Sequence, residues 1–410
     1  MTLTWSPGQE KALAAISAWL KDPNGKQTFY LAGHAGTGKT ACLQHALADV
    51  KGTILYGAFT GRAASVMRRA GLPTATTIHK LIYSPAGDPP SPAAIEKLRM
   101  EVKRLYAINE PGARATADRM AEQLARAEQD GKRTGPRFTL NLNSDLRSAK
   151  LCVIDECSFV DARIGADLES FGTKILVVGD PAQLPPIYGA GYFTSREPDA
   201  YLHEIHRQEL DSPILYLADL ARRGERLPYG KHGDCEVLRS GDPSLEHRVL
   251  KADIVIVGRN RTRHASNAKI RRLLGHPHEA PPVAGERVIC LRNDHELGFL
   301  NGTQWIVDRC VPDLDRMTAH FDLTSTDDGT RVECDSWLHH FFAREEELKN
   351  LERRKFNEVD AAYCVTGHKA QGGSWENVIV FDESAAFGRD ADRWRYTSIT
   401  RASKTIQVVQ

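Results

Sequence analysis

The chain has 410 residues, of which 41% are hydrophobic and 26% charged, with a formal net charge of +1. The length predicts two to four domains, and the composition is typical of a soluble globular protein. No apolar run reaches the length of about 18 residues that a membrane span needs, and the first residues lack the features of a secretory signal. Eight scattered cysteines with no C-x-x-C pair favour reduced thiols in a cytoplasm over a zinc site or disulfides.

The first predicted helix begins at the sequence Ser6-Pro7-Gly8-Gln9. Ser6 fits the N-cap, Pro7 the first turn, and Gln9 the third position of a capping box. Gln9 also stands where nucleotide-driven motors often place a glutamine that reads the adenine edge. The sequence therefore supports capping and adenine recognition equally for this residue.

Residues 33–40 read G-H-A-G-T-G-K-T, between an apolar strand pattern at 28–32 and a helical pattern at 41–48. Strand, glycine-rich turn and helix form the context that a phosphate-binding loop requires. Its backbone N–H groups and the helix N-terminus attract phosphate. We expect Lys39 to reach the β- and γ-phosphates of ATP and Thr40 to ligate Mg²⁺. The other phosphate-binding positions would be Gly33, Gly36, Thr37 and Gly38.

Two further strand-to-helix junctions follow, one after a strand at 53–59 and one at 76–81. Such junctions lie at the carboxyl edge of a parallel sheet, where ligands bind in open α/β folds. Thr60, Arg62 and His79 are therefore candidates to hold a sugar–phosphate backbone. Capping and surface positions are the commoner roles of Thr and Arg near helix starts.

Residues 84–148 interrupt this alternation. They contain a loop, two helical patterns at about 92–108 and 114–129, and a short alternating strand near 137–142. The segment is mildly basic, and a helical hairpin with charged outer faces is slightly favoured over a dedicated nucleic-acid surface.

The buried-strand pattern resumes at residues 150–154 and ends in Asp155-Glu156. We expect Asp155 to hold the Mg²⁺ shell and Glu156 to polarise the attacking water. Another continuous apolar run, 174–179, leads into the sequence G-D-P-A-Q-L-P-P. Gln183 in this loop is the candidate that senses the γ-phosphate.

A second α/β region begins with a strand at 252–257. The following stretch, 258–276, carries six cations and no acid, which indicates either a solvated face or a nearby polyanion. Residues 286–334 alternate over short lengths and predict a small β-barrel-like module. A helix is predicted over about 336–354, and the α/β pattern returns at 361–366.

Taken together, these blocks resemble superfamily 1 helicases of the RecD/Dda-like branch. The matching strings, in family order, are Gln9, G-H-A-G-T-G-K-T, F-T-G-R-A-A, T-I-H-K, V-I-D-E-C-S, V-V-G-D-P-A-Q-L-P-P-I, I-H-R-Q, V-T-G-H-K-A-Q-G and Y-T-S-I-T-R-A. The resemblance implies an α/β fold of two RecA-like P-loop domains, with a mainly helical insertion in the first and an SH3-like β module in the second. The implied boundaries are 1–83 and 149–205 for the first domain, 84–148 for a pin-bearing insertion, 206–285 and 355–410 for the second domain, and 286–354 for the β module with its following helix.

The resemblance also assigns roles to individual residues. The catalytic set would be Lys39, Glu156, Gln183, Arg207 and Arg401, with Gly372 added to the nucleotide site. An arginine brought from a second lobe stabilises the charge of phosphoryl transfer by ~10³–10⁵ in rate. The strand-contacting set would be Thr60, Arg62, His79, Thr366, His368 and Lys369. Ser374 stands where many relatives carry a glutamate, and Phe138 is a weak candidate for the strand-separating pin.

The implied activity is ATP-driven 5′-to-3′ translocation on single-stranded DNA with separation of duplex strands. Its cofactors would be ATP and Mg²⁺, and its partners single-stranded and forked duplex DNA, with replication or recombination proteins besides. We expect a monomer in the cytoplasm of a bacterium or a phage-infected cell. Two alternatives stay open: a motor of the same fold that acts on RNA, and an ATP-gated nucleic-acid clamp that does not unwind. A nuclease and a small-molecule kinase are disfavoured.

Overall fold

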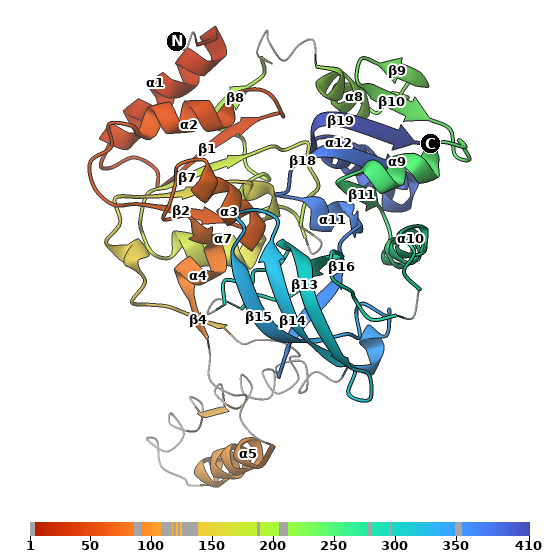
Figure 1. The fold of residues 1–410 in the computed structure, drawn as a ribbon. Helices are drawn as coiled ribbons and strands as arrows, with labels where there is room; N and C mark the ends of the chain where they lie inside the picture. The colour runs from red at the N-terminus through yellow and green to blue at the C-terminus, as the bar shows by residue number, and fades with distance from the viewer. Residues whose placement is uncertain are drawn as a thin grey trace. The chain divides into compact units, whose positions relative to one another are not determined.

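The computed structural model describes residues 5–85, 92–107, 117, 120, 121, 124, 138–186, 189–204, 212–277, 280–294, 297–348 and 355–410. The chain divides into two compact units, one made of Met1–Leu81 with Asn143–Gln410 and the other of Ile82–Leu142. The larger unit holds two α/β lobes and a closed barrel (Figure 1). Within the described residues, no helix has both the length and the apolarity to cross a bilayer.

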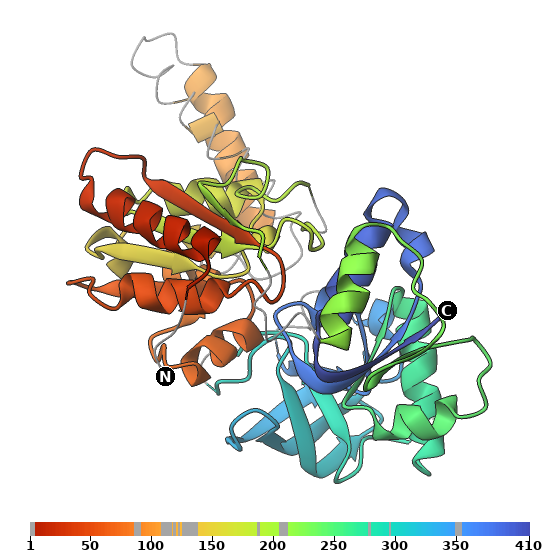
Figure 2. The same ribbon diagram turned by 90° about the horizontal axis from the view of Figure 1, so that it is seen from above.

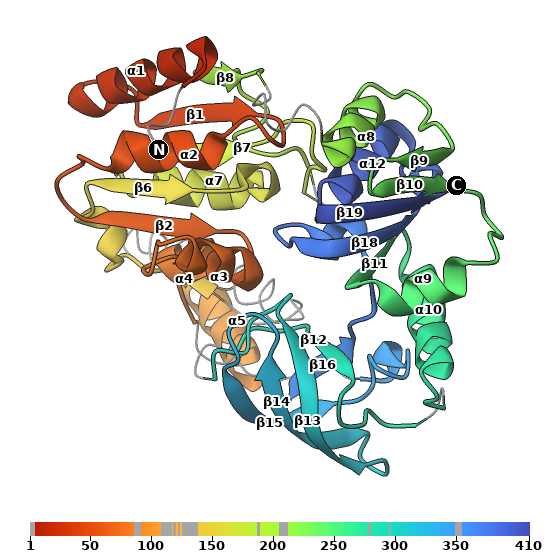
Figure 3. The same ribbon diagram turned by 45° about the horizontal axis from the view of Figure 1, so that its top comes forward.

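The front lobe is built on a six-stranded parallel sheet with the order β3-β2-β6-β7-β1-β8. Its strands are β1 (Thr28–Gly33), β2 (Ile54–Ala58), β3 (Thr76–Thr77), β6 (Leu151–Ile154), β7 (Ile175–Gly179) and β8 (Ala200–Leu202). Helices lie against this sheet in Figure 3: α1 (Pro7–Lys21), α2 (Lys39–Leu47), α3 (Gly61–Arg69), α4 (Ile78–Ile82) and α7 (Ala162–Glu169). The central strands are buried along their whole length, as both faces of a parallel sheet are covered.

The parallel arrangement places several predicted site residues at one edge of the sheet. The P-loop follows β1, the Asp155-Glu156 pair follows β6, and Asp180 follows β7. Register brings Ala32 beside Gly179, and Ile154 beside Val177. These three loops therefore emerge side by side, as expected for a ligand site in an open α/β fold.

The rear lobe contains a second six-stranded sheet with the order β17-β11-β18-β19-β10-β9. All its pairs are parallel except β9 with β10. The strands are β9 (Gly230–His232), β10 (Cys235–Leu238), β11 (Ile254–Val257), β17 (Cys364–Thr366), β18 (Trp375–Phe381) and β19 (Ala402–Val409). Its helices are α8 (Pro213–Arg222), α9 (Leu245–Lys251), α10 (Asn260–Leu273), α11 (Gly367–Ala370) and α12 (Ala391–Ile399), and α8 and α12 pack side by side (Figure 2).

The barrel is inserted between α10 and β17 and closes through five strands. They are β12 (Arg287–Cys290), β13 (Gln304–Asp313), β14 (Thr318–Ser325), β15 (Arg331–Trp337) and β16 (Asn357–Ala361). Alternate side chains of these strands, including Trp305, Phe321 and Leu323, fill the interior. The small β module expected from the sequence is therefore present.

The helix predicted over 336–354 is wrong for the described residues. Strand β15 runs to Trp337, and only a short 3₁₀ turn, Glu345–Glu347, follows before residue 349. The alternation of buried Val332 and Cys334 with exposed Glu333 and Asp335 continues the two-residue period of a strand into this region. The acidic residues at 345–347 are typical of a helix, but they form only a 3₁₀ turn in the structure.

The smaller unit contains β4 (Tyr83–Pro85), α5 (Pro92–Tyr106) and β5 (Phe138–Leu140). Strands β4 and β5 pair antiparallel, with Pro85 opposite Phe138. Helix α5 confirms the first helical pattern of the insertion, which was predicted at about 92–108. The second, at 114–129, falls mostly outside the described residues, as does the side chain of the pin candidate Phe138.

Candidate functional site

The P-loop turns directly from β1 into α2. Gly36 and Gly38 have φ angles of 76° and 77°, a left-handed conformation that costs a glycine little. The Nζ of Lys39 donates to the carbonyl oxygens of Gly33 and His34, each at 2.8 Å. Thr37 closes the turn by donating from Oγ1 to the same His34 carbonyl at 2.8 Å, and Thr40 is exposed at the first turn of α2. The loop thus has the strand–turn–helix geometry that binds phosphate.

Gln9 caps α1 and also contacts the backbone of this loop. Its Oε1 accepts from the Ser6 N–H at 3.0 Å and its backbone N–H donates to Ser6 Oγ at 3.3 Å, which completes the predicted capping box. Its Nε2 donates to the Thr37 carbonyl at 3.1 Å. The capping role is confirmed, and the side chain also fixes the loop backbone. Contact with an adenine edge stays a prediction.

The two acids after β6 share an environment that disfavours their charge. Burial raises the pKa of Asp155, against the opposing effects of the Glu156 N–H bond and of Lys39. Burial also raises the pKa of Glu156, with Arg401 opposing and Asp155 adding to the rise. Glu156 has a φ of 52°, a strained conformation for a residue with a side chain that costs about 1–3 kcal/mol. Such strain, held by surrounding structure, is common where a side chain must be aimed.

The loop after β7 begins with a fully buried carboxylate. Asp180 accepts hydrogen bonds from His34 Nδ1 at 3.2 Å, the Ala182 N–H at 2.9 Å and the Tyr396 hydroxyl at 2.5 Å. Burial alone would raise the pKa of Asp180, but the hydrogen bond from His34, the charge of Lys39 and the hydrogen bond from Tyr396 outweigh it and lower that pKa. Nearby, Gln183 is 6% exposed, and its Oε1 has no partner among the residues that the structure describes. An unsatisfied amide oxygen beside the P-loop is available to a water or a ligand.

Arg401 reaches this site from the rear lobe. Its Nη1 lies 4.0 Å from Glu156 Oε1, and its Nε donates to the Thr397 carbonyl at 3.0 Å. The same α12 segment contacts the front lobe again, where the Leu184 N–H donates to Thr397 Oγ1 at 2.9 Å. The second predicted arginine, Arg207, lies outside the described residues.

These contacts bring Lys39, Asp155, Glu156 and Arg401 into one site, with the Gln183 loop beside it. Hydroxyl and carboxylate oxygens suit Mg²⁺, so Thr40 and Asp155 are the residues that would hold it. Mg²⁺, when bound, neutralises phosphate charge during transfer. The set of groups therefore fits a magnesium nucleotide.

The predicted strand-contacting hydroxyls both serve as helix N-caps. Thr60 Oγ1 accepts from the Ala63 N–H at 3.1 Å at the start of α3, and Thr366 Oγ1 accepts from the Lys369 N–H at 3.4 Å at the start of α11. Gly372, which follows the end of α11, lies at the start of α3: an added Cβ would lie 3.0 Å from the Cβ of Ala63 and 3.2 Å from Thr60 Oγ1. The structure therefore places Gly372 against α3.

Arg62 is more enclosed than a strand-contacting residue on a surface would be. It is 6% exposed, and its Cζ lies 4.2 Å from the ring centroid of Trp375 in the rear lobe. Its Nε and Nη1 have no partner within the described part of the chain, and burial lowers the pKa of its guanidinium. In this structure Arg62 joins the two lobes by stacking on an aromatic ring.

The two predicted histidines are half-buried and the predicted lysine is exposed. Burial lowers the pKa of both His79 and His368, which favours their neutral forms. The His79 ring meets Phe59 edge-on at 6.4 Å, and the His368 ring lies 5.8 Å from that of Phe387. Lys369, on the exposed side of α11, is the most accessible cation of the set.

Three of the six cations of residues 258–276 have counter-charges that tertiary contacts supply. Arg263 pairs with Asp360, Arg271 with Glu286 at 2.7 Å, and Lys269 with Glu246 at 2.9 Å. Arg263 and Arg271 are buried on α10. The sequence pattern therefore reflects structural pairing for these three cations and not a polyanion site.

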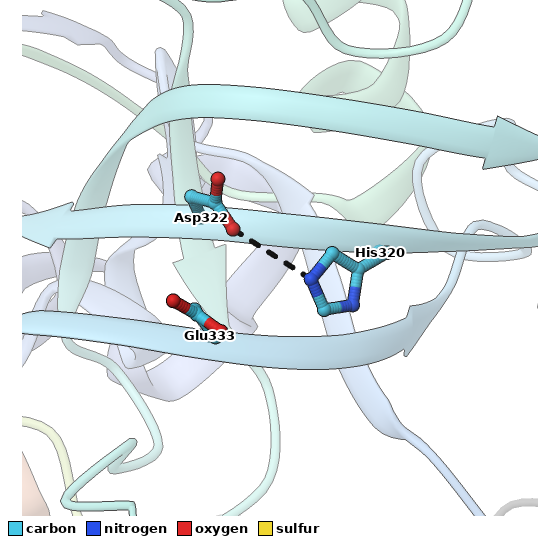
Figure 4. A group of neighbouring side chains, drawn as sticks. All are labelled: His320, Asp322 and Glu333. Atoms are coloured by element: carbon cyan, nitrogen blue, oxygen red, sulfur yellow. Dashed lines mark ion pairs between the residues drawn. The ribbon is translucent and has the colours of Figure 1, made fainter.

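A separate group of polar side chains lies on the outside of the barrel. Figure 4 shows His320 and Asp322 of β14 beside Glu333 of β15, with an ion-pair distance of 3.6 Å between His320 Nε2 and Asp322 Oδ1. Asp335 accepts from the other ring nitrogen of His320 at 2.9 Å. None of the predicted site residues belongs to this group.

Comparison with protein families gives two matches. An AAA-domain model (AAA_30) matches residues 4–236, more than half of the chain, and a UvrD-like helicase C-terminal domain model matches residues 361–409. The chain belongs to the AAA_30 family. With the helicase C-terminal domain behind it, the chain is an ATP-dependent superfamily 1 helicase, as the sequence motifs indicated. A search among curated proteins finds no match.

Solved structures agree with this helicase assignment at the level of fold. A structure of two Pif1 helicases coordinating at forked double-stranded DNA is 16% identical, with 99% of this chain and 92% of that chain covered and a TM-score of 0.54. Pif1 from Bacteroides bound to single-stranded DNA is 15% identical, with the same coverage and a TM-score of 0.53. These similarities confirm the fold of two RecA-like domains for the helicase.

Two residues that join the lobes at this site were not predicted from the sequence. Trp375 stacks on Arg62, and Tyr396 bonds to Asp180 and to the Ala35 N–H of the P-loop. Both lie in or next to motif blocks that were quoted for other residues. Their contacts join segments more than 200 residues apart, so no local pattern could reveal them.

Proposed function

We propose that this helicase acts on DNA, moves 5′-to-3′ along a single strand and separates forked duplexes. The observation that carries the proposal is the contact of Arg401 with Glu156 across the two lobes. A motor of this kind needs hydrolysis to depend on lobe closure, and an arginine of one lobe at the acid of the other meets that need. DNA as substrate is supported by the Pif1 structures bound to forked and single-stranded DNA, and the direction by the resemblance of the motifs.

In the proposed mechanism, Lys39 and the P-loop amides bind the phosphates, and Thr40 and Asp155 would hold Mg²⁺. Glu156 orients the attacking water and accepts its proton, and Gln183 contacts the γ-phosphate. Arg401 stabilises the negative charge that phosphoryl transfer spreads over the oxygens. Arg207 is proposed for a similar role on its motif alone.

Strand grip is proposed at the starts of α3 and α4 in the front lobe and of α11 in the rear lobe. Thr60 and His79 belong to the front lobe, and Thr366, His368 and Lys369 to the rear lobe. Because one group moves with each lobe, opening and closing would shift the two grips along the strand. Contacts of this kind are mainly with phosphates, so binding is sequence-tolerant and salt-sensitive. Arg62 would act by joining the lobes at Trp375 beside this grip.

We further propose the division into two RecA-like domains, 1–83 with 149–205 and 206–285 with 355–410. The pin-bearing insertion would occupy 84–148 and the β module 286–354. Cleavage by a protease under native conditions tests these boundaries, with cuts expected near the junctions and not within the sheets.

The decisive experiment measures unwinding of three duplexes that carry a 5′ overhang, a 3′ overhang or blunt ends. Release of the strand from the 5′-tailed duplex alone is expected. Release from the 3′-tailed duplex alone would overturn the direction, and ATP hydrolysis without any release would favour a clamp. Comparing the stimulation of ATP hydrolysis by oligo-dT and oligo-U separates a DNA motor from an RNA motor.

A further inference from the structure

The Tyr396 hydroxyl joins the rear lobe to two parts of the nucleotide site. Tyr396 lies on α12, is 2% exposed and accepts a hydrogen bond from the Ala35 N–H of the P-loop at 2.8 Å. It donates to Asp180 Oδ2 at 2.5 Å. One buried oxygen atom therefore connects α12, the phosphate-binding loop and the loop that carries Gln183.

Asp180 holds its side of this connection in a fixed arrangement. It is fully buried, and its other oxygen, Oδ1, accepts from His34 Nδ1 at 3.2 Å and from the Ala182 N–H at 2.9 Å. Tyr201 bonds to the second ring nitrogen of His34 at 2.9 Å. A buried carboxylate with this many donors has little freedom to turn. The phenol oxygen of Tyr396 is therefore positioned from the front lobe as well as from its own helix.

The segment that bears Tyr396 also positions the arginine. Thr397 is the next residue, and its Oγ1 accepts a hydrogen bond from the Leu184 N–H at 2.9 Å. Its carbonyl oxygen accepts a hydrogen bond from Arg401 Nε at 3.0 Å. The side chain of Leu184 is 1% exposed and belongs to the rear-lobe core. A change at the Tyr396 hydroxyl is thus one residue away from the groups that hold Arg401.

We propose that Tyr396 is a positioning residue for ATP hydrolysis, which makes the placement of Arg401 depend on the phosphate occupancy of the P-loop. The Ala35 N–H belongs to the loop whose amides bind phosphate, so a phosphate oxygen competes with the Tyr396 hydroxyl for it. When the amide is taken, Tyr396 keeps only its bond to Asp180, and α12 is free to settle with Arg401 at the phosphates. The inference rests on the proposed ATP-driven function and specifies how the two lobes detect the nucleotide.

The test is Tyr396→Phe, which removes the hydroxyl and keeps the packing of the ring. The substitution removes the hydrogen bonds of Tyr396 to Ala35 and Asp180, so α12 no longer positions Arg401 at the phosphates. The kcat of DNA-stimulated ATP hydrolysis is therefore expected to fall about tenfold, which corresponds to the loss of one good hydrogen bond in the transition state. The KM for ATP is expected to stay the same or decrease, since Ala35 no longer has to give up a partner. Steady-state ATP hydrolysis with oligo-dT measures both quantities.

Tyr30→Phe is the matched control. Tyr30 is a buried tyrosine of β1 whose hydroxyl has no partner among the residues that the structure describes. Removing this hydroxyl breaks no hydrogen bond within the described residues, so wild-type kcat and KM are expected. A fall in kcat for both variants would show that any lost phenol oxygen disturbs this core, and would overturn the specific role of Tyr396.

The remaining outcomes separate this inference from the proposed function. Wild-type kcat in Tyr396→Phe overturns the positioning role, while the helicase function stands on the wild-type protein. A higher KM together with a lower melting temperature identifies Tyr396 as a structural residue only, and also overturns it. A wild-type protein without DNA-stimulated ATP hydrolysis refutes the proposed function itself, before any variant is compared.

Discussion

Arg401 and Glu156 meet across the two lobes, with Nη1 of the arginine 4.0 Å from Oε1 of the glutamate. At this distance the pair is a long, weak ion pair, and the guanidinium is held more firmly by the carbonyl oxygens of Thr397 and Gly373 at 3.0 and 3.3 Å. The arginine is therefore fixed by its own lobe and directed at the acid of the other lobe. This arrangement lets one guanidinium act on groups at the nucleotide without being locked to them.

Replacing Arg401 is expected to affect hydrolysis far more than nucleotide binding. Arg401→Ala should lower kcat by ~10³ or more, because transition-state charge loses its stabilisation, while the affinity for a non-hydrolysable ATP analogue changes little. Arg393 supplies the control, since it is an exposed arginine of α12, the helix that precedes Arg401, and is paired with Asp390 at 3.6 Å. Arg393→Ala should hydrolyse ATP at the wild-type rate. Equal losses in both variants would contradict a catalytic role for Arg401.

Lys39→Ala should abolish DNA-stimulated ATP hydrolysis and unwinding together. The ammonium donates to the Gly33 and His34 carbonyl oxygens of the P-loop. Its loss removes the cation that reaches the β- and γ-phosphates. Colorimetric phosphate release measures the effect, and hydrolysis at the wild-type rate would refute the assignment of the site.

Lys369 is expected to contribute to strand grip through charge. Lys369→Ala should weaken binding to oligo-dT and make the dependence of log K on log salt less steep by about 0.7, the value for one phosphate contact on a single strand. Lys404, an exposed cation paired with Glu376 at 2.8 Å, is the control, and its alanine variant should keep the wild-type slope. Fluorescence anisotropy across a salt series gives both slopes. An unchanged slope for Lys369→Ala would remove this residue from the grip.

The buried pair of Arg271 and Glu286 should matter for stability. Both side chains are at most 3% exposed, and Arg271 donates from Nε and Nη2 to the two carboxylate oxygens at 2.7 and 2.9 Å. Glu286→Ala removes the carboxylate that neutralises a buried cation, so a loss of about 3–5 kcal/mol is expected. Lys269 on the same helix is exposed and paired with exposed Glu246, so Lys269→Ala should cost about 0–1 kcal/mol. Urea unfolding compares the two, and similar midpoints would contradict the prediction.

Protonation of His368 should destabilise the fold at mildly acidic pH. Its folded-state pKa lies below the ordinary value because the ring is buried, with Asp390 opposing the shift. A lowered pKa means that the unfolded chain binds the proton more tightly, so the contribution is complete above about pH 6.5 and is lost as the pH falls below it. The melting temperature of the wild type should fall between pH 7.5 and pH 5.5, and that of His368→Gln should fall less over the same range. Parallel pH profiles would contradict the assignment.

The nucleotide site could be read from the sequence because its signals are local. The spacing of Gly33, Gly38 and Lys39 defines the turn, and the apolar run before Asp155 defines a strand that must end at the sheet edge. Parallel pairing then brings these segments together without further information. For this reason the P-loop, the strand-ending acids and the class of fold were all predictable before any coordinates.

Long-range contacts decided the rest. Three cations of residues 258–276 pair with acids outside that stretch, namely Asp360, Glu286 and Glu246, so the local sequence could not predict these partners. The burial of Arg62 against Trp375 and the bonds of Tyr396 to Ala35 and Asp180 likewise depend on how the lobes pack. Local spacing fixes which backbone forms a turn or a strand, but the partner of a charge or a hydroxyl is set by whatever the folded chain brings within reach. Only the tertiary structure contains that information.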